Sequence, residues 1–514
     1  MTTATVGRLA TLAVALAVTS GVASPPAHSF DVRQYGAVGD GRTMDTAALQ
    51  KAIDAAAAAG GGTVVLSPGT YLSGSLDLKS HVTLRLEAQA TLLGSAHRTD
   101  YRKLNFHGLV LADNQEDIGI CGTGTIDGQG TALASETEHL RKQGLLPKSN
   151  ETERPVLIDF RDCKQVTVRD VTLKDSACWV EDYRDCEHLT IENIAVHSIA
   201  AYNNDGIDID GCTHVVVRGC DIDSEDDAIC LKSEAKRCDD VLVENCRLRS
   251  SCNGLKFGTG SRAGFRKVRC RNLNIYDTYI SAIALEVVDG GEMDNVRISD
   301  VKITDSNNAI FVRLGHRNVD GAVGSLHGVV ISNVTAELPN RPADQFNKFP
   351  VLEGWKHKNR PTALTAAIIG LPGHPVQDIT LQDIRITYGG IGSVARPGQL
   401  RLESLAKVPE CTSAYPEILP FGTLPAWGFY CRHAEGIRFT NVTLRVQSSD
   451  YRPALVCDDA QDIVLHRFHV LSAGTEPVIV LNDVQRATIR NSTGPPGAAC
   501  FLEKMGSTRD IDGP

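Results

Sequence analysis

Apolar and polar residues alternate in short segments that recur through the middle of the chain. Each copy has a run in which every second residue is apolar, then Asn, Asp or Gly, then a further apolar residue, as in "CEHLTIENIAV" and "CDDVLVENCRL". Six successive copies are spaced 23 to 28 residues apart, and their first strand residues are Val166, Leu189, Val215, Val241, Val268 and Val296. Such alternation predicts strands with one buried face, and its regular recurrence indicates a solenoid.

A unit this short cannot bury its apolar face alone, but stacked copies can. Alternating strands with loops of variable length at this period predict an all-β fold, a single-stranded right-handed parallel β-helix with one repeat per coil. Stacking in register would align the polar residue after each strand as a side-chain ladder. The residues at this position are Asp170, Asn193, Asn245, Asn272, Asp300, Asn333, Asp383 and Asn441.

The first residues of the chain differ in character from the repeats. Arg8 precedes an apolar run from Leu9 to about Val18, and small residues follow around Ala23. This pattern is typical of a secretory signal peptide, which we place at residues 1–24, and the run is too short to span a bilayer. We therefore expect a secreted or periplasmic protein, and no other stretch is apolar enough to cross a membrane.

The β-helix is predicted over residues 28–495. Asp45 is expected to cap a helix from about Thr46 to Ala59, which would cover the open N-terminal end of the solenoid. The region 337–427 departs from the period and is rich in Pro and Gly, so we interpret it as an irregular insertion with one embedded coil near "AAIIGLPGHPVQDITLQDIRI". Residues 496–514 are predicted to be an irregular tail.

Composition narrows the possible partners. The 514 residues carry a formal net charge of −10 with no basic run, which argues against a nucleic-acid surface. The 15 cysteines show no spacing suited to zinc, and we predict neither a metal nor a cofactor. Four cysteines share one repeat position, and stacked thiols in the core are the favoured explanation, with a disulfide left open: Cys163, Cys186, Cys212 and Cys238.

Acidic residues gather in "YNNDGIDIDGCTHVVVRGCDIDSEDDAICLKS", residues 202–233. Stacking "NNDGIDID", "EDDAICLK", "CNGLKFGT" and "ISAIALEV" in register places Asp205, Asp227 and Asn253 in one column and Asp226 in the next. Coil spacing alone brings the three carboxylates of two adjacent coils into a patch roughly 5 to 8 Å across. The register therefore predicts an acidic cluster on one edge of the solenoid.

Crowded carboxylates cannot all ionise cheaply, so at least one pKa is raised. A protonated carboxyl beside an ionised one can catalyse glycoside hydrolysis. In that reaction the acid protonates the leaving oxygen and the base activates water. Three carboxylates also suit a hard cation such as calcium, and a solvated acidic rim without a role is the third reading. The residues alone leave these alternatives open.

Three motifs together, "FDVRQYGAVGDG", "NNDGIDID" and "DDAICLKS", resemble the polygalacturonase family of glycoside hydrolases, family 28. The resemblance covers about residues 30–490 and implies a pectin lyase-like right-handed β-helix with an inverting mechanism on pectic polysaccharides. The Asn-Thr-Asp motif of the family falls on Asn203, Asn204 and Asp205, and its Asp-Asp motif falls on Asp226 and Asp227. By this resemblance Asp226 is the general acid, while Asp205 and Asp227 hold and deprotonate the water.

Two departures concern the substrate. The Gly-His-Gly motif falls on "CNG", so Asn253 stands where a His is expected, and the Arg-Ile-Lys motif falls on "ALE", which puts Ala284 and Glu286 in place of the basic pair. In polygalacturonases that pair grips a substrate carboxylate, so its loss casts doubt on plain polygalacturonan. The candidate substrate-binding residues are Asn203, Asn253, Lys256 and Arg313, although a local ion pair with Glu286 is the favoured role of Arg313.

The leading hypothesis from the sequence is a glycoside hydrolase that cleaves a pectic polysaccharide, with galacturonan-containing chains such as rhamnogalacturonan as first guesses. A polysaccharide lyase or epimerase on the same scaffold is the second hypothesis, although the missing basic pair argues against it. A non-catalytic carbohydrate-binding β-helix is the third; it would have no reason to stack three acids, and only 5% aromatic residues leave few platforms for sugar stacking.

Overall fold

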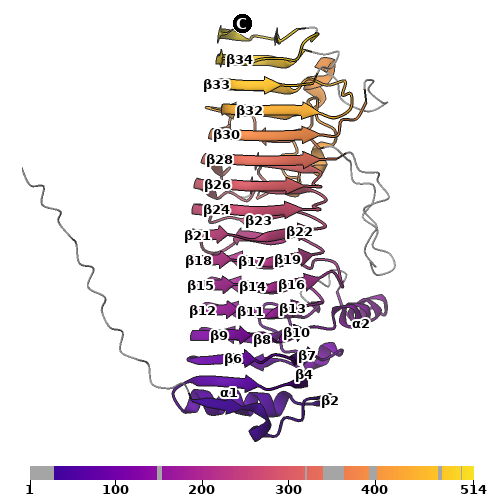
Figure 1. The fold of residues 1–514 in the computed structure, drawn as a ribbon, viewed down its shortest axis with the longest axis vertical. Helices are drawn as coiled ribbons and strands as arrows, with labels where there is room; N and C mark the ends of the chain where they lie inside the picture. The colour runs from indigo at the N-terminus through magenta and orange to yellow at the C-terminus, as the bar shows by residue number, and fades with distance from the viewer. Residues whose placement is uncertain are drawn as a thin grey trace, which may run out of the picture.

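The chain folds into a parallel β-helix whose coils stack along one axis (Figure 1). The structure is a computed structural model that describes residues 28–147, 153–318, 321–339, 364–392, 402–472, 477–498 and 500–513. The proposed signal peptide, residues 1–24, lies outside the described residues. Every strand pairing between successive coils is parallel, so the predicted solenoid is confirmed.

Three ladders of strands run along the solenoid. The first ladder, which carries the candidate site, contains β5 (Leu76–Asp77), β8 (Gly108–Asp113), β11 (Val156–Arg161), β14 (Glu181–Arg184), β17 (Ile207–Asp210), β20 (Ile229–Ser233), β23 (Leu255–Ser261), β25 (Ser281–Val287), β27 (Asn308–Leu314), β29 (Ala366–Ile369), β31 (Phe429–Glu435) and β35 (Leu502–Met505).

The second ladder contains β1 (Ser29–Asp31), β3 (Gly62–Leu66), β6 (Val82–Leu86), β9 (Glu116–Gly122), β12 (Lys164–Arg169), β15 (Glu187–Glu192), β18 (Thr213–Arg218), β21 (Cys238–Glu244) and β36 (Arg509–Asp512). The third contains β2 (Asp40–Met44), β4 (Gly69–Ser73), β7 (Ala90–Gly94), β10 (Thr125–Asp127), β13 (Thr172–Lys174), β16 (Ala195–Ser198), β19 (Asp221–Ser224) and β22 (Arg247–Ser250).

Toward the C-terminus, long strands run through more than one ladder without a break. These are β24 (Phe265–Tyr276), β26 (Glu292–Thr304), β28 (Ser325–Leu338), β30 (Val376–Tyr388), β32 (Arg438–Val446), β33 (Leu455–Val470) and β34 (Ile479–Arg490).

The register follows the sequence repeat. Val166 pairs with Leu189, Leu189 with Val215, and Val215 with Val241, and the pairing continues through Val268. The predicted ladder of polar residues is present: each of its eight members has a positive φ. The left-handed backbone conformation suits Asn and Asp better than other non-glycine residues, which explains their recurrence at this turn. The amide of Asn272, for example, donates to Oδ1 of Asn245 at 2.7 Å.

The interior is filled by apolar residues that point inward from each ladder, such as Ile207, Ile229 and Leu255, which are fully buried. The four stacked cysteines lie in this core, and all 15 cysteines are free. The backbone N–H of Cys186 donates to the sulfur of Cys212 in the next coil at 3.3 Å. Stacked thiols, rather than disulfides, therefore occupy this column, as the sequence favoured.

Helix α1 (Thr46–Ala58) lies at the N-terminal end of the stack, with Leu49 and Ile53 buried against the first strands (Figure 1). Its predicted cap differs in detail. The Asp45 carboxylate makes no hydrogen bond to the helix; it accepts instead from the backbone N–H groups of Val38 and Gly39, at 2.7 and 3.0 Å. A second helix, α2 (Gly130–Lys142), projects from the side of the solenoid and had not been predicted.

The ends of the β-helix also differ from expectation. Strands β35 and β36 pair with β34, so the stack extends past residue 495 and the tail predicted as irregular forms a last coil. Within the predicted insertion, β29 and β30 form the expected embedded coil. Residues 402–427 form a loop segment with two short 3-10 helices, Leu402–Lys407 and Leu419–Phe421. Two other 3-10 helices of the described residues, Val32–Tyr35 and Arg98–Asp100, lie in the N-terminal coils. Among the described residues, no helix is long and apolar enough to cross a membrane.

Candidate active site

A cavity of about 520 Å³ opens on the first ladder, beside the turns that lead into β17 and β20. The residues of the acidic segment that line it are joined by three aromatic side chains, among them Phe106, and by two cations. The lining includes Asn203, Asp205, Asp226, Asp227, Trp179, Arg184, Lys232 and Tyr415. The cavity is therefore a mostly acidic pocket with aromatic walls.

The three aspartates converge in this cavity as the register predicted. Carboxylate oxygens of Asp205 and Asp227 lie within 4.8 Å of each other, and the same holds for Asp226 and Asp227. Backbone hydrogen bonds between the two coils fix this arrangement, since the N–H of Gly206 donates to the carbonyl of Asp227 at 2.8 Å. Asp205 and Asp227 are distant in sequence, and the stacking of two coils brings them together.

Asp227 is held by partners from the following coil. Its Oδ1 accepts from the backbone N–H and the side-chain amide of Asn253, at 3.0 and 2.8 Å. Its Oδ2 lies 3.1 Å from Nζ of Lys256. Burial alone would lower the pKa of Lys256, but the Asp227 carboxylate holds that pKa well above its ordinary value.

Lys256 and Asn253 therefore support Asp227, and neither lines the cavity. Lys256 is 1% exposed, so its ammonium faces the aspartate rather than a sugar carboxylate, which differs from the substrate-binding role expected for it. Asn253 occupies the position of the expected His and makes the hydrogen bond to an aspartate that its amide allows.

Asp226 is half-buried at the cavity, and burial raises its pKa to about 7, with the Asp227 and Glu225 carboxylates adding to the effect. Its Oδ1 accepts from the backbone N–H of Asp227 at 2.9 Å. A carboxyl with such a pKa carries a proton in a large fraction of molecules near neutral pH. Asp226 can therefore donate a proton to a group that enters the cavity.

Asp205 has a different environment. Burial raises its pKa well above the ordinary value, and the Asp208 and Asp226 carboxylates raise it further. Nζ of Lys232 lies 3.5 Å from Asp205, pairs with Asp208, and sits 3.6 Å from the centre of the Trp179 ring. Lys232 stands opposite Asp210 in the strand register. Its ammonium group nevertheless forms its ion pairs with Asp205 and Asp208.

Asn203 and Asn204 have separate tasks. Asn203 lines the cavity, and its Oδ1 accepts from Nη2 of Arg154 at 2.7 Å. Asn204 is fully buried, and its amide donates to the carbonyls of Ser176 and Cys178, at 3.0 and 2.6 Å. The second asparagine of the motif thus shapes the turn that presents Asp205.

Arg313 does not reach the cavity. It pairs in register with Glu286, as predicted, but its guanidinium donates to the carbonyls of Cys411, Ala414 and Tyr415, the last at 2.8 Å. The expectation that Arg313 binds substrate is therefore corrected: it is 1% exposed and fastens the loop segment 402–427 to the solenoid. The repeat pattern in the sequence does not indicate that this arginine binds a loop about 100 residues further along the chain.

Trp179 and Arg184 line the cavity although the sequence did not mark them as site residues, and the same is true of Tyr415. Tyr415 comes from the fastened loop, and its ring centre lies 5.1 Å from Nζ of Lys256. A lone Tyr in a Pro-rich segment without a repeat carried no signal for its position.

Glu286 stands where the family resemblance expects a basic residue. Its side chain is fully buried, and among the described residues neither carboxyl oxygen has a hydrogen-bond partner. Burial raises the pKa of Glu286 to about 8, although Lys256 and Arg313 act in the opposite direction. This position therefore holds a largely neutral carboxyl at neutral pH, and its neighbour Ala284 carries no charge.

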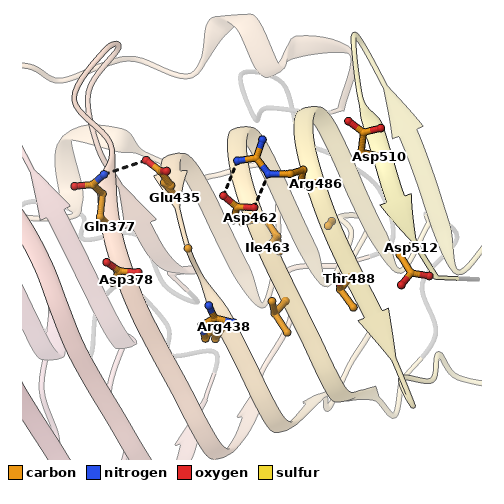
Figure 2. Close-up of a pocket in the computed structure, with 13 residues that line it drawn as sticks. Gln377, Asp378, Glu435, Arg438, Asp462, Ile463, Arg486, Thr488, Asp510 and Asp512 are labelled. Carbon is orange, nitrogen blue, oxygen red and sulfur yellow. Dashed lines mark hydrogen bonds and ion pairs between the residues drawn. The ribbon is translucent and has the colours of Figure 1, made fainter.

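A second cavity, of about 410 Å³, lies over the second ladder near the C-terminus (Figure 2). Some of its polar side chains are paired along the coils: the amide of Gln377 donates to Glu435 at 3.0 Å, and Arg486 donates to both oxygens of Asp462 at 2.7 Å. The Arg486 hydrogen bonds lower the pKa of Asp462. That carboxyl is an unsuitable proton donor, so the first cavity is the candidate active site.

Comparison with known proteins shows the family to which the chain belongs. The family model described as "Glycosyl hydrolases family 28" matches residues 61–338. A Vitis vinifera protein named "Probable polygalacturonase" is 25% identical over 396 residues, which cover 70% of this chain and 74% of that protein. Mannuronan C5-epimerase AlgE3 of Azotobacter vinelandii is 30% identical over 146 residues, but these cover only 27% of this chain and 8% of that protein.

The fold has solved counterparts. The family 28 exopolygalacturonase of Yersinia enterocolitica superposes with a TM-score of 0.57 at 17% identity, over 95% of this chain and 80% of that one. At this identity the likeness shows the shared β-helix fold alone.

Proposed function

The chain belongs to glycosyl hydrolases family 28, and we propose that it cleaves glycosidic bonds of a pectic, galacturonic-acid-containing polysaccharide with inversion at the anomeric carbon. The observation that carries the proposal is the convergence of Asp205, Asp226 and Asp227 in one cavity, with Asp226 able to hold a proton near neutral pH. The leader pattern of residues 1–24 supports secretion as part of the same proposal.

The proposed mechanism assigns one proton transfer to each side of the sugar. Asp226 gives its proton to the oxygen of the leaving group as the glycosidic bond breaks. A water held between Asp205 and Asp227 attacks the anomeric carbon and loses its proton to a carboxylate. We assign Asp227 as the base, because hydrogen bonds from Asn253 and an ion pair with Lys256 at 3.1 Å fix its orientation.

The charges around the cavity bear on which pectic sugar is cleaved. The two cations among its described lining residues, Arg184 and Lys232, already pair with aspartates, and Glu286 is a largely neutral acid. A described cation free to grip a sugar carboxylate is therefore lacking at this cavity. This supports a substrate in which the sugar at the cleaved bond is neutral or esterified, as in rhamnogalacturonan, over plain polygalacturonan.

The same charges weigh against the other candidate activities. A lyase or epimerase needs a base that can remove a sugar proton, whereas Lys232 and Lys256 are buried and lie within 3.5 Å of aspartates. Those ammonium groups also oppose a calcium ion at the acidic cluster, which offers thiols in place of further oxygen ligands. A pure binding protein would not require a proton donor.

The test is an assay of new reducing ends on defined pectic fragments: polygalacturonan, its methyl ester, and rhamnogalacturonan. We expect release from at least one of them and the opposite anomer in the first product seen by NMR. Ultraviolet absorbance from an unsaturated product would identify a lyase instead. No product from any fragment would overturn the proposed hydrolysis.

A further inference from the structure

Three side chains of ligand type meet on the second ladder, away from the acidic cavity of the first. Glu187 and His188 belong to β15, and His214 belongs to β18 in the next coil. One carboxylate oxygen and one nitrogen from each imidazole lie within 4.8 Å of one another. The two imidazole rings are stacked, with centres 4.7 Å apart and an interplanar angle of 11°.

A fourth residue sets the protonation of one imidazole. Nδ1 of His214 lies 2.9 Å from Oδ2 of Asp240, which occupies the same turn position one coil further on. A carboxylate can only accept, so Nδ1–H donates to Asp240, and in the neutral imidazole Nε2 then carries the lone pair. A carboxylate bound to the far nitrogen is the usual support of a metal-binding histidine. Nε2 of His188 lies 3.7 Å from Oε1 of Glu187, so these two ligand atoms also face each other.

We propose that Glu187, His188 and His214 bind a divalent transition-metal ion of the Zn²⁺ type, with Asp240 as a positioning residue. Two imidazoles and one carboxylate form a donor set that zinc uses in open sites, where water takes the fourth position. Zinc–ligand bonds of about 2.0 to 2.2 Å draw the ligand atoms to roughly 3.4 Å from one another. Because the imidazoles are exposed, rotation of the side chains brings the atoms together without a shift of the coils.

The neighbouring charges do not block this site. Nζ of Lys164 lies 3.7 Å from Glu187, and Nη2 of Arg269 lies 3.7 Å from Asp240. Both ion pairs are solvent-exposed and therefore weak, so a metal ion can displace the lysine from Glu187. A bound ion would join β15 to β18, which predicts that the metal stabilises the folded solenoid.

The experiment uses the full chain without a histidine tag, stripped by a chelator and titrated with Zn²⁺ by calorimetry. We expect one tight equivalent, at least about a tenfold weaker dissociation constant in His188→Ala and in His214→Ala, and roughly tenfold weakening in Asp240→Asn. Zn²⁺ should raise the thermal midpoint of the parent protein and leave that of His214→Ala unchanged. The control His197→Ala changes an exposed imidazole on β16 that pairs with Asp223 and should bind as the parent does.

Free thiols are the competing ligands, so Co²⁺ replaces Zn²⁺ in a second measurement. Imidazole and carboxylate ligation gives visible bands without the thiolate-to-cobalt absorption in the near ultraviolet. A thiolate band, binding that survives both histidine substitutions, or the absence of binding would each overturn the proposed site.

Discussion

The side-chain amide of Asn253 donates to Oδ1 of Asp227 at 2.8 Å, one coil away. The backbone N–H of the same asparagine donates to the same oxygen at 3.0 Å, and its own Oδ1 accepts from the N–H of Ser281 at 3.0 Å. The amide thereby ties the proposed base to the next two coils. Since an amide does not titrate, this support is the same at every pH at which the protein is folded.

Asn253→Ala removes the side-chain hydrogen bond to Asp227 and frees that carboxylate to rotate. We expect kcat to fall by roughly 10- to 100-fold, with little change in KM, because a misaligned base acts on the transition state more than on binding. Steady-state kinetics on the active pectic fragment measure this. The control Asn274→Ala alters an exposed asparagine of β24, and an equal loss of activity in both variants would contradict the positioning role.

Asp226→Asn removes the proposed proton donor. We expect kcat to fall by at least about 10², the usual scale of a general acid. The fold should survive, since Asn imitates the protonated carboxyl. Asp221→Asn is the matched control, because Asp221 lies on the preceding strand with its side chain 57% exposed. Unchanged turnover in Asp226→Asn would remove Asp226 from the mechanism.

The pH dependence of kcat follows from the same residue. The pKa of Asp226 is raised to about 7, so activity should fall as the pH rises through about 7 and the acid loses its proton. Lys256 lowers that pKa, so Lys256→Met should shift the alkaline limb of the profile to higher pH while lowering kcat. Arg266→Met, an exposed change, should leave the limb in place. A shift toward lower pH in Lys256→Met would contradict the assignment.

Glu286 makes stability depend on pH. Burial raises its pKa from 4.5 to about 8, so the folded state binds the proton more tightly than the unfolded state does. The stability it contributes is fully present below about pH 4.5 and is lost as the pH rises through about 8, at up to about 1.4 kcal/mol per pH unit.

Glu286→Gln should therefore reduce the loss of unfolding free energy between about pH 5 and about pH 8, as measured by urea denaturation. Glu116→Gln, an exposed change, provides the reference. The same slope in Glu286→Gln and in the parent protein would show that this carboxyl does not titrate with a raised pKa.

Arg313→Ala should release the loop that carries Tyr415. Three backbone carbonyls lose their charged donor, so we expect faster proteolysis within residues 411–415 and a larger change in KM than in kcat. Arg262→Ala, an exposed ion-pair change, serves as the comparison. Kinetics and protease resistance identical to the parent protein would show that the loop is held by other contacts.

Much of this architecture can be predicted from the sequence, because a parallel β-helix converts a linear repeat directly into contacts. The alignment of Ile207 with Ile229 sets the register of the two neighbouring coils, and that register brings Asp205 beside Asp227. The polar ladder was equally predictable, since a left-handed turn in every coil selects Asn or Asp, as at Asn272.

The contacts that could not be predicted are made by side chains whose partners are not set by the repeat. The charge of Lys256 pairs with Asp227 because the lysine is buried beside it, and sequence gives no measure of that burial. Arg313 could be placed next to Glu286 in register, yet its guanidinium turns away to bind the 411–415 loop. Similarly, Asp45 precedes a helix as a cap does, but the nearby N–H groups of Val38 and Gly39 capture its carboxylate.

Each of the proposed catalytic aspartates belongs to one of two neighbouring coils, the next coil supplies Asn253 and Lys256 to hold Asp227, and coils further away only lengthen the stack. Chain length and chemistry are consequently separable: a whole coil gained or lost near β26 would alter how much glycan the protein spans while the reacting groups stay in place. A residue gained within the strand β17 or β20 would instead shift the register that aligns the aspartates. The length of glycan that the protein spans can therefore change by whole coils without any change in the catalytic residues.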